Sequence, residues 1–149
     1  MLWCLLVLSL PTDNTAARMR AWRALKAGGA VVLRDGVYVL PDGAAQRDQL
    51  REVAADVRAN GGSARLMTDV NAEEPIEPLL DRSADFAPLV EAAKAALAQP
   101  DAARSARRLH KAFDQLAAID FFPGEAQRQA AEAVAELEQH VAQAADPDE

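Results

Sequence analysis

A dense group of cations near the N-terminus carries the clearest chemical signal in the chain. The group lies in one short helical segment without any acidic residue and consists of Arg18, Arg20, Arg23 and Lys26. Arg34 adds a fifth positive charge just before an Asp35-Gly36 pair. The chain as a whole has a formal net charge of -7, so this segment departs from the overall balance. A local cationic surface of this kind is typical of a site for phosphates or another anion.

The same segment has an apolar stripe at helical spacing, made of Met19, Trp22 and Leu25. Successive residues of a helix are about 100° apart, so Arg20 and Arg23 fall roughly opposite this stripe. We therefore predict that the stripe faces the core, and that stacking of Trp22 on a ligand is secondary to packing. Arg18 falls on the apolar side in the first turn, where it either reaches solvent along the surface or pairs with a carboxylate. A solvated cationic face remains an equal alternative to an anion-binding face.

A second basic stripe lies in the C-terminal half, with the i, i+3, i+4, i+7 spacing of one helix face: Arg104, Arg107, Arg108 and Lys111. One interpretation is a phosphate-contacting face. The favoured one is a dock for acidic segments of the same protein, because residues 71–149 hold sixteen acidic against seven basic residues.

No pattern for catalysis, metal binding or cofactor binding stands out. Cys4 is the only cysteine, and His110 and His140 have no partners at metal-ligand spacing. The chain has neither a nucleophile elbow nor a nucleotide-binding glycine loop. We therefore predict no catalytic residue, no metal and no cofactor.

The elements that must position the cations follow a recognisable order. Strands are predicted at 2–10, 30–33, 37–40 and 64–70, and helices around the first basic segment and at 44–60. Asp35-Gly36 supplies a tight turn between the two middle strands, and Gly28-Gly29 stops the first helix. The order β-α-β-β-α-β is the ferredoxin-like plan, an antiparallel sheet with both helices on one face. The other face needs a cover, which either a second copy or the C-terminal helices could provide.

The composition changes after residue 72. A proline-broken connector (EEPIEP) is followed by three predicted helices and an acidic tail at 146–149. We predict an α/β protein of the α+β type, with a sheet domain at 1–72 and a helical extension at 73–149 packed on it. The apolar start MLWCLLVLSL lacks a basic leader and is too short to span a bilayer, so a buried strand and a cytoplasmic location are expected.

Three separated stretches carry a resemblance to a known family: LVLSLPTDNTAARMRAWRALKAGGAVVLRDGVYVLP, then LLDRSADF, then AAIDFFPG. They resemble the N-terminal domain of ChrB, the chromate-resistance regulatory protein. The resemblance implies a bacterial regulator that binds operator DNA upstream of a chromate-efflux operon, with chromate as its effector. By position, the resemblance implies that the DNA contacts are the five cations Arg18, Arg20, Arg23, Lys26 and Arg34. We also expect a homodimer.

Two departures keep alternatives open. Full-length ChrB proteins look longer, with a second domain after this one, so chromate sensing could reside there. The sheet pattern also resembles the small nucleases of CRISPR adaptation, which place an aspartate at the end of the first strand, where this chain has Leu8-Ser9-Leu10. The alternatives to a DNA-binding regulator are a small oxyanion-handling or chromate-reducing protein, and a partner of another regulator that does not itself bind DNA.

Overall fold

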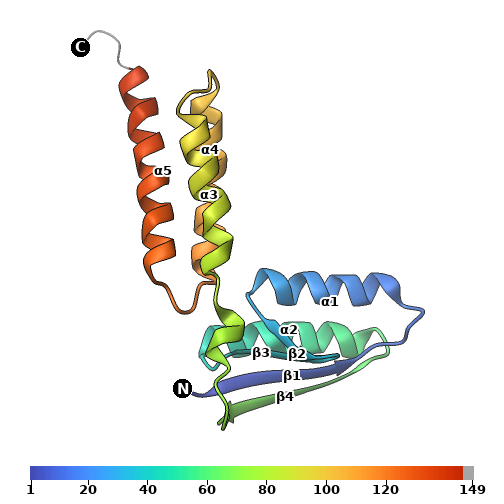
Figure 1. The fold of residues 1–149 in the computed structure, drawn as a ribbon. Coiled ribbons are helices and arrows are strands. Elements are labelled where there is room, and N and C mark those ends of the chain that lie inside the picture. Colours follow the sequence, from blue (N-terminus) through green and yellow to red (C-terminus); the bar gives the residue numbers. More distant parts are fainter. Residues whose placement is uncertain (146–149) are drawn as a thin grey trace. The chain divides into compact units, whose positions relative to one another are not determined.

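The computed structural model describes residues 1–145, which form two compact units (Figure 1). The first unit is Met1–Leu80 and the second begins at Asp81. A four-stranded sheet in the first unit and three helices in the second make the protein α+β, as the sequence predicts.

The first unit has the ferredoxin-like order of elements. In chain order they are β1 (Trp3–Ser9), α1 (Thr15–Ala27), β2 (Val31–Arg34), β3 (Val37–Pro41), α2 (Ala44–Ala59), β4 (Ser63–Val70) and the short 3-10 helix η1 (Glu77–Leu80). The strand order in the sheet is β2-β3-β1-β4, and every neighbouring pair is antiparallel. Both helices lie on one side of the sheet (Figure 1). The predicted β-α-β-β-α-β plan is therefore confirmed.

The core of this unit lies between the sheet and α2. In the antiparallel register Leu6 stands opposite Tyr38, and Cys4 stands opposite Leu40. Leu6, Leu40 and the α2 residue Leu50 are fully buried. Alternate residues of a strand point to opposite faces, so this set shares the face that α2 covers.

Helix α1 packs through two alanines and one leucine. Its buried residues are Ala17, Ala21 and Leu25, at i, i+4 and i+8. Met19 and Trp22 are instead 40% and 43% exposed, so the prediction that they face the core is wrong. Alanine methyl groups let a helix approach its neighbour closely, and this orientation leaves the bulky side chains at the margin of the contact.

The predicted hairpin is present and its turn rests on the central strand. Asp35 and Gly36 connect β2 to β3, and Gly36 has a φ of +77°, in the left-handed region that favours glycine. The N–H of Leu8 in β1 donates a hydrogen bond of 2.8 Å to the Gly36 carbonyl. The turn is thereby fixed beside the end of β1, opposite the first turns of α1.

The sheet face turned away from α1 and α2 carries an apolar row. One row across the strands joins Val31, Val39, Leu5 and Met67. Val39 is buried and its neighbours Val31 and Leu5 are half-buried, whereas Met67 is 43% exposed. This row lies on the sheet face that the sequence analysis expected to be covered by a second copy or by the C-terminal helices.

The second unit is built from three helices, all of them predicted: α3 (Ser83–Ala96), α4 (Ala102–Ala118) and α5 (Glu125–Ala144). Its core consists of side chains from each helix, namely Ala93, Ala96, Ala106, Leu109, Val134 and Leu137. The Phe86 and Phe113 rings lie 6.0 Å apart, in a tilted arrangement typical of aromatic pairs. The predicted acidic tail lies outside the described residues. Across the part of the chain that is described, no helix is long and apolar enough to cross a membrane.

Candidate anion-binding face and groove

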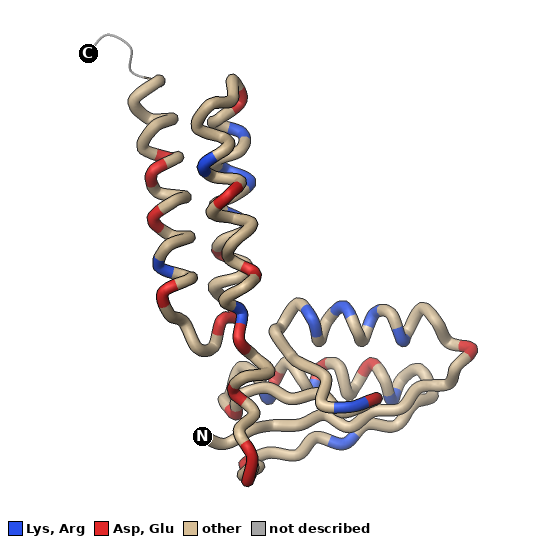
Figure 2. The backbone as a smooth tube through the Cα atoms, in the orientation of Figure 1, with Lys and Arg blue, Asp and Glu red and all other residues tan. Residues whose placement is uncertain are grey.

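The cations predicted as one set separate into three environments in the structure. Four of them belong to α1 and Arg34 ends β2, and Figure 2 shows the basic residues along α1 in blue. All five side chains belong to exposed residues, so the sequence placed them correctly at the surface. The five cations have different partners, however, and therefore differ in how readily each can bind an anion.

Arg20 is already paired. Its Nε lies 2.9 Å from Oδ2 of Asp56 on α2, and its Nη2 donates to Oδ1 of the same carboxylate at 3.2 Å. This bidentate contact ties α1 to α2 and neutralises the arginine locally. An incoming phosphate would have to displace Asp56, so Arg20 is a poor candidate for anion binding.

Lys26 lies over an aromatic ring. Its Nζ is 4.7 Å from the centroid of the Trp22 ring, one helical turn earlier. Such a cation–π contact is worth about 0.5–1 kcal/mol at an exposed site. It holds the indole in place and leaves the charge of the ammonium group available to a ligand.

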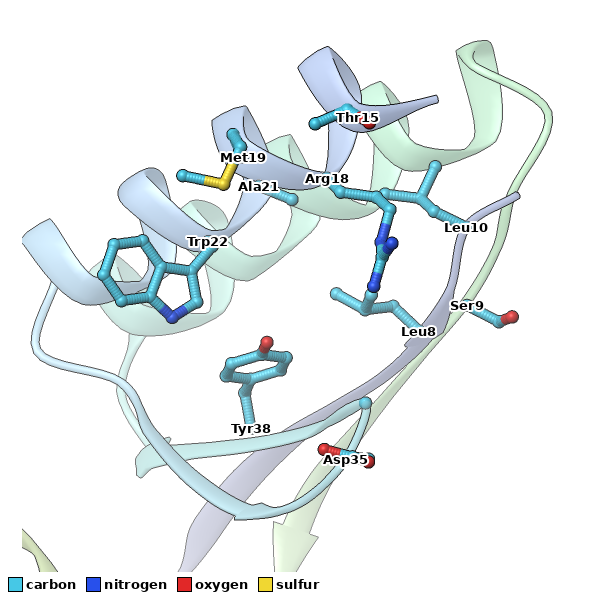
Figure 3. Close-up of a pocket in the computed structure, with 11 residues that line it drawn as sticks. Leu8, Ser9, Leu10, Thr15, Arg18, Met19, Ala21, Trp22, Asp35 and Tyr38 are labelled. Carbon is cyan, nitrogen blue, oxygen red and sulfur yellow. The ribbon is translucent and has the colours of Figure 1, made fainter. Parts of the chain in front are cut away.

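The remaining three cations, Arg18, Arg23 and Arg34, form no ion pair or side-chain hydrogen bond with any described residue. Arg23 is exposed on α1, and Arg34 is exposed at the end of β2. Arg18 differs from both, because its guanidinium turns from α1 toward Leu8 of β1 (Figure 3).

Arg18 reaches into a groove of about 760 Å³ between α1 and the hairpin. Met19 and Trp22 line it from α1, Leu8 from β1, and Asp35 and Tyr38 from the hairpin. Figure 3 shows the Trp22 indole and the Tyr38 hydroxyl both directed into this space. Trp22, which the sequence analysis assigned to packing, and Tyr38 therefore both lie at a surface groove.

Tyr38 supplies a neutral hydroxyl to this groove. Partial burial raises its pKa above the ordinary value, and the nearby Asp35 carboxylate raises it further. At neutral pH the phenol is therefore protonated and can both donate and accept a hydrogen bond. The alternation of side chains along β3 could have placed Tyr38 on the sheet face that the helices cover, where it stands opposite Leu6.

The second basic stripe is exposed along α4. Arg104, Arg107, Arg108 and Lys111 make no ion pair or side-chain hydrogen bond with any residue of 1–145. The expected contact with acidic segments of the same protein is thus not seen among these residues. The stripe itself stays a prediction.

His110, beside this stripe, bridges two carboxylates. Its Nδ1 is 3.1 Å from Glu138 of α5, and its Nε2 is 3.1 Å from Asp114. The hydrogen bond with Glu138, followed by the charges of Asp114 and Glu138, raises the pKa of His110 above its ordinary value. Among the described residues no group of three or more histidine, cysteine or acidic side chains could hold a metal ion.

The first unit is thus a ferredoxin-like domain with unpaired cations on α1 and at its hairpin, beside a mixed groove. Residues 18–82 match the family model described as Protein ChrB, N-terminal. The chain is also 40% identical over 138 residues to Protein ChrB of Cupriavidus metallidurans. Residues 18–82 of the chain are therefore similar to the N-terminal domain of ChrB.

The match to the relative covers 86% of this chain and 43% of Protein ChrB, so the chain spans less than half the length of that relative. No solved structure matches the chain.

Proposed function

We propose that this protein is a chromate-resistance regulator, or its DNA-binding half, that acts on an operator upstream of a chromate-efflux operon. The observation that carries the proposal is the set of surface cations on α1 and the hairpin without partners among the described residues, in an otherwise acidic chain. The family match supports the link to chromate resistance.

The proposed mechanism is non-enzymatic and electrostatic. Arg23 and Lys26 on α1, together with Arg34 on the hairpin, contact phosphates of duplex DNA and position the domain on it. Arg20 holds α1 against α2 through Asp56 instead of meeting DNA directly. Arg18 faces the groove, so its share of the phosphate contacts is smaller than the sequence suggested.

A homodimer completes this proposal, because two copies of α1 would set the distance between two half-sites. The apolar row on the sheet face turned away from the helices, where exposed Met67 stands opposite half-buried Leu5, supports a second copy at this face. Met67→Glu should therefore shift the sedimentation equilibrium toward monomer. An unchanged mass distribution would contradict this interface.

Fluorescence anisotropy of labelled upstream DNA, titrated at several salt concentrations, tests the DNA-binding step. Each phosphate contact contributes about -0.9 to the log–log salt slope, so Arg23→Gln combined with Arg34→Gln should make the slope less negative by about 1.8 per protomer. Arg20→Gln is the matched control on the same helix and should leave the slope nearly unchanged. Absence of binding at low salt, or an unaltered slope in the double variant, would overturn the assignment.

The same titration with chromate tests regulation. Release of the DNA by chromate but not by sulfate is the expected result for a protein that senses chromate itself. Binding that ignores chromate would refute sensing by these residues and leave the DNA-binding step intact. Thiol-based chromate reduction is disfavoured, because Cys4 is fully buried and burial raises the pKa of its thiol to about 11.

A further inference from the structure

We infer that the groove between α1 and the β2–β3 turn binds a small organic monoanion with a flat apolar body, of which an aromatic carboxylate is the simplest case. This inference does not depend on DNA binding, because its anion-binding group is Arg18, whereas the phosphate-contacting Arg23 and Arg34 are not among the residues that line the groove. Arg18 binds the carboxylate, and Trp22 and Tyr38 contact the ring.

Arg18 is the anion-binding group. Its guanidinium points into the groove (Figure 3) and forms no ion pair or side-chain hydrogen bond with any described residue. A guanidinium matches a carboxylate in a planar, bidentate geometry. In contrast to Arg20, which has Asp56 in that position, Arg18 has its donors available.

The walls favour a flat apolar body. Leu8, Met19 and Trp22 line the groove, and Trp22 is 43% exposed although it is the largest side chain on α1. Lys26 over the Trp22 ring fixes the indole. The volume of about 760 Å³ lies within the range of roughly 300–1,000 Å³ that is usual for small-molecule sites.

An inorganic dianion fits the groove less well. Asp35 lines it and would repel a doubly charged oxyanion, whereas a monoanion held at Arg18 is repelled less. The apolar side chains of the lining, such as Leu8 and Met19, donate no hydrogen bond that could replace the water around such an ion. Chromate, the effector proposed above, is therefore not the ligand that we assign to this groove.

Binding of 2-naphthoate, measured by isothermal titration calorimetry, tests the inference, with 2-naphthamide as the neutral analogue. The wild-type protein should bind the carboxylate about tenfold or more tightly than the amide, because a hydrogen-bonded charge pair is lost with the amide. In Arg18→Gln this preference should disappear while the affinity for the amide stays the same. Arg23→Gln, on the same helix but outside the groove, should bind both compounds like the wild-type protein.

The Trp22 indole N–H signal in a ¹H–¹⁵N spectrum locates the site, and Trp22→Phe assigns it against Trp3. Naphthoate should shift the Trp22 signal and leave that of buried Trp3 in place. Equal affinity for carboxylate and amide, a preference retained in Arg18→Gln, or no Trp22 shift at saturation would overturn the inference. Displacement of naphthoate by chromate or sulfate at equal concentration would do so as well, in favour of an inorganic oxyanion site.

Discussion

Replacing Gly36 with alanine tests how the hairpin turn is held beside the groove. Gly36 has a φ of +77°, and a Cβ atom added there would lie 2.6 Å from the backbone carbonyl oxygen of Leu8. Backbone cannot move aside as a flexible side chain can, so the turn must shift away from β1. That shift would also break the 2.8 Å hydrogen bond from the Leu8 N–H to the Gly36 carbonyl.

The expected destabilisation has two parts. An alanine in the left-handed region costs about 1–2 kcal/mol, and the lost hydrogen bond adds about 0.5–1.5 kcal/mol. The free energy of unfolding should therefore fall by about 1.5–3.5 kcal/mol in Gly36→Ala. With a urea dependence of about 2 kcal/mol per molar, the unfolding midpoint should drop by about 0.8–1.8 M.

Gly61→Ala is the matched control, since Gly61 has a φ of +83° but a Cβ there meets only Pro11 Cγ, at 3.8 Å. It should show the left-handed cost alone. Tryptophan fluorescence during urea unfolding is a suitable readout, because both tryptophans, Trp3 and Trp22, belong to the first unit. Equal midpoint shifts in the two variants would show that contact between the turn and Leu8 adds nothing, and would refute the reasoning.

Two further predictions concern titrating groups. Because Glu138 and Asp114 raise the pKa of His110 above 6.5, charged His110 stabilises the second unit below about pH 6.5, and this contribution is lost as the pH rises through the raised pKa. Thermal unfolding followed by circular dichroism should show this decline, and His110→Gln should remove it whereas His140→Gln should not; an identical pH profile in His110→Gln would refute it. Cys4, whose pKa burial raises to about 11, should resist iodoacetamide at pH 8 in the folded protein and react fully in urea. Rapid alkylation of the folded protein would contradict its burial.

Much of the fold could be predicted because its signals are local. Asp35-Gly36 defines a turn by its own backbone preferences, and Gly28-Gly29 ends α1 as expected. The three helices of the second unit follow from apolar spacing within each segment. These features depend only on residues that are close in the sequence, so they could be predicted without knowing the tertiary contacts.

The orientation of α1 could not be predicted in this way. Hydrophobicity assigns the core face to Trp22 and Met19, because alanines contribute little to an apolar stripe. Close packing of helices instead rewards small side chains, and Ala17 and Ala21 are buried together with Leu25, the one member of the predicted stripe that does face the core. The face of α1 that packs is selected by how closely its side chains let the two helices approach, and not by hydrophobicity. That face can be identified only when the neighbouring helix is known.

The site was only partly predictable for a related reason. Arg20 and Asp56 are 36 positions apart, so nothing local shows that one cation of the set is already paired. The orientation of α1 decides the rest, because packing on alanines turns Arg18, Met19 and Trp22 toward the hairpin. A helix packed through its large residues would have buried Trp22 and closed the groove. The orientation of α1, which the sequence analysis assigned wrongly, is therefore what creates the proposed ligand site. Ala21→Leu tests this dependence, because the larger side chain forces α1 away from its neighbours. The variant should bind naphthoate more weakly even though Arg18 is retained.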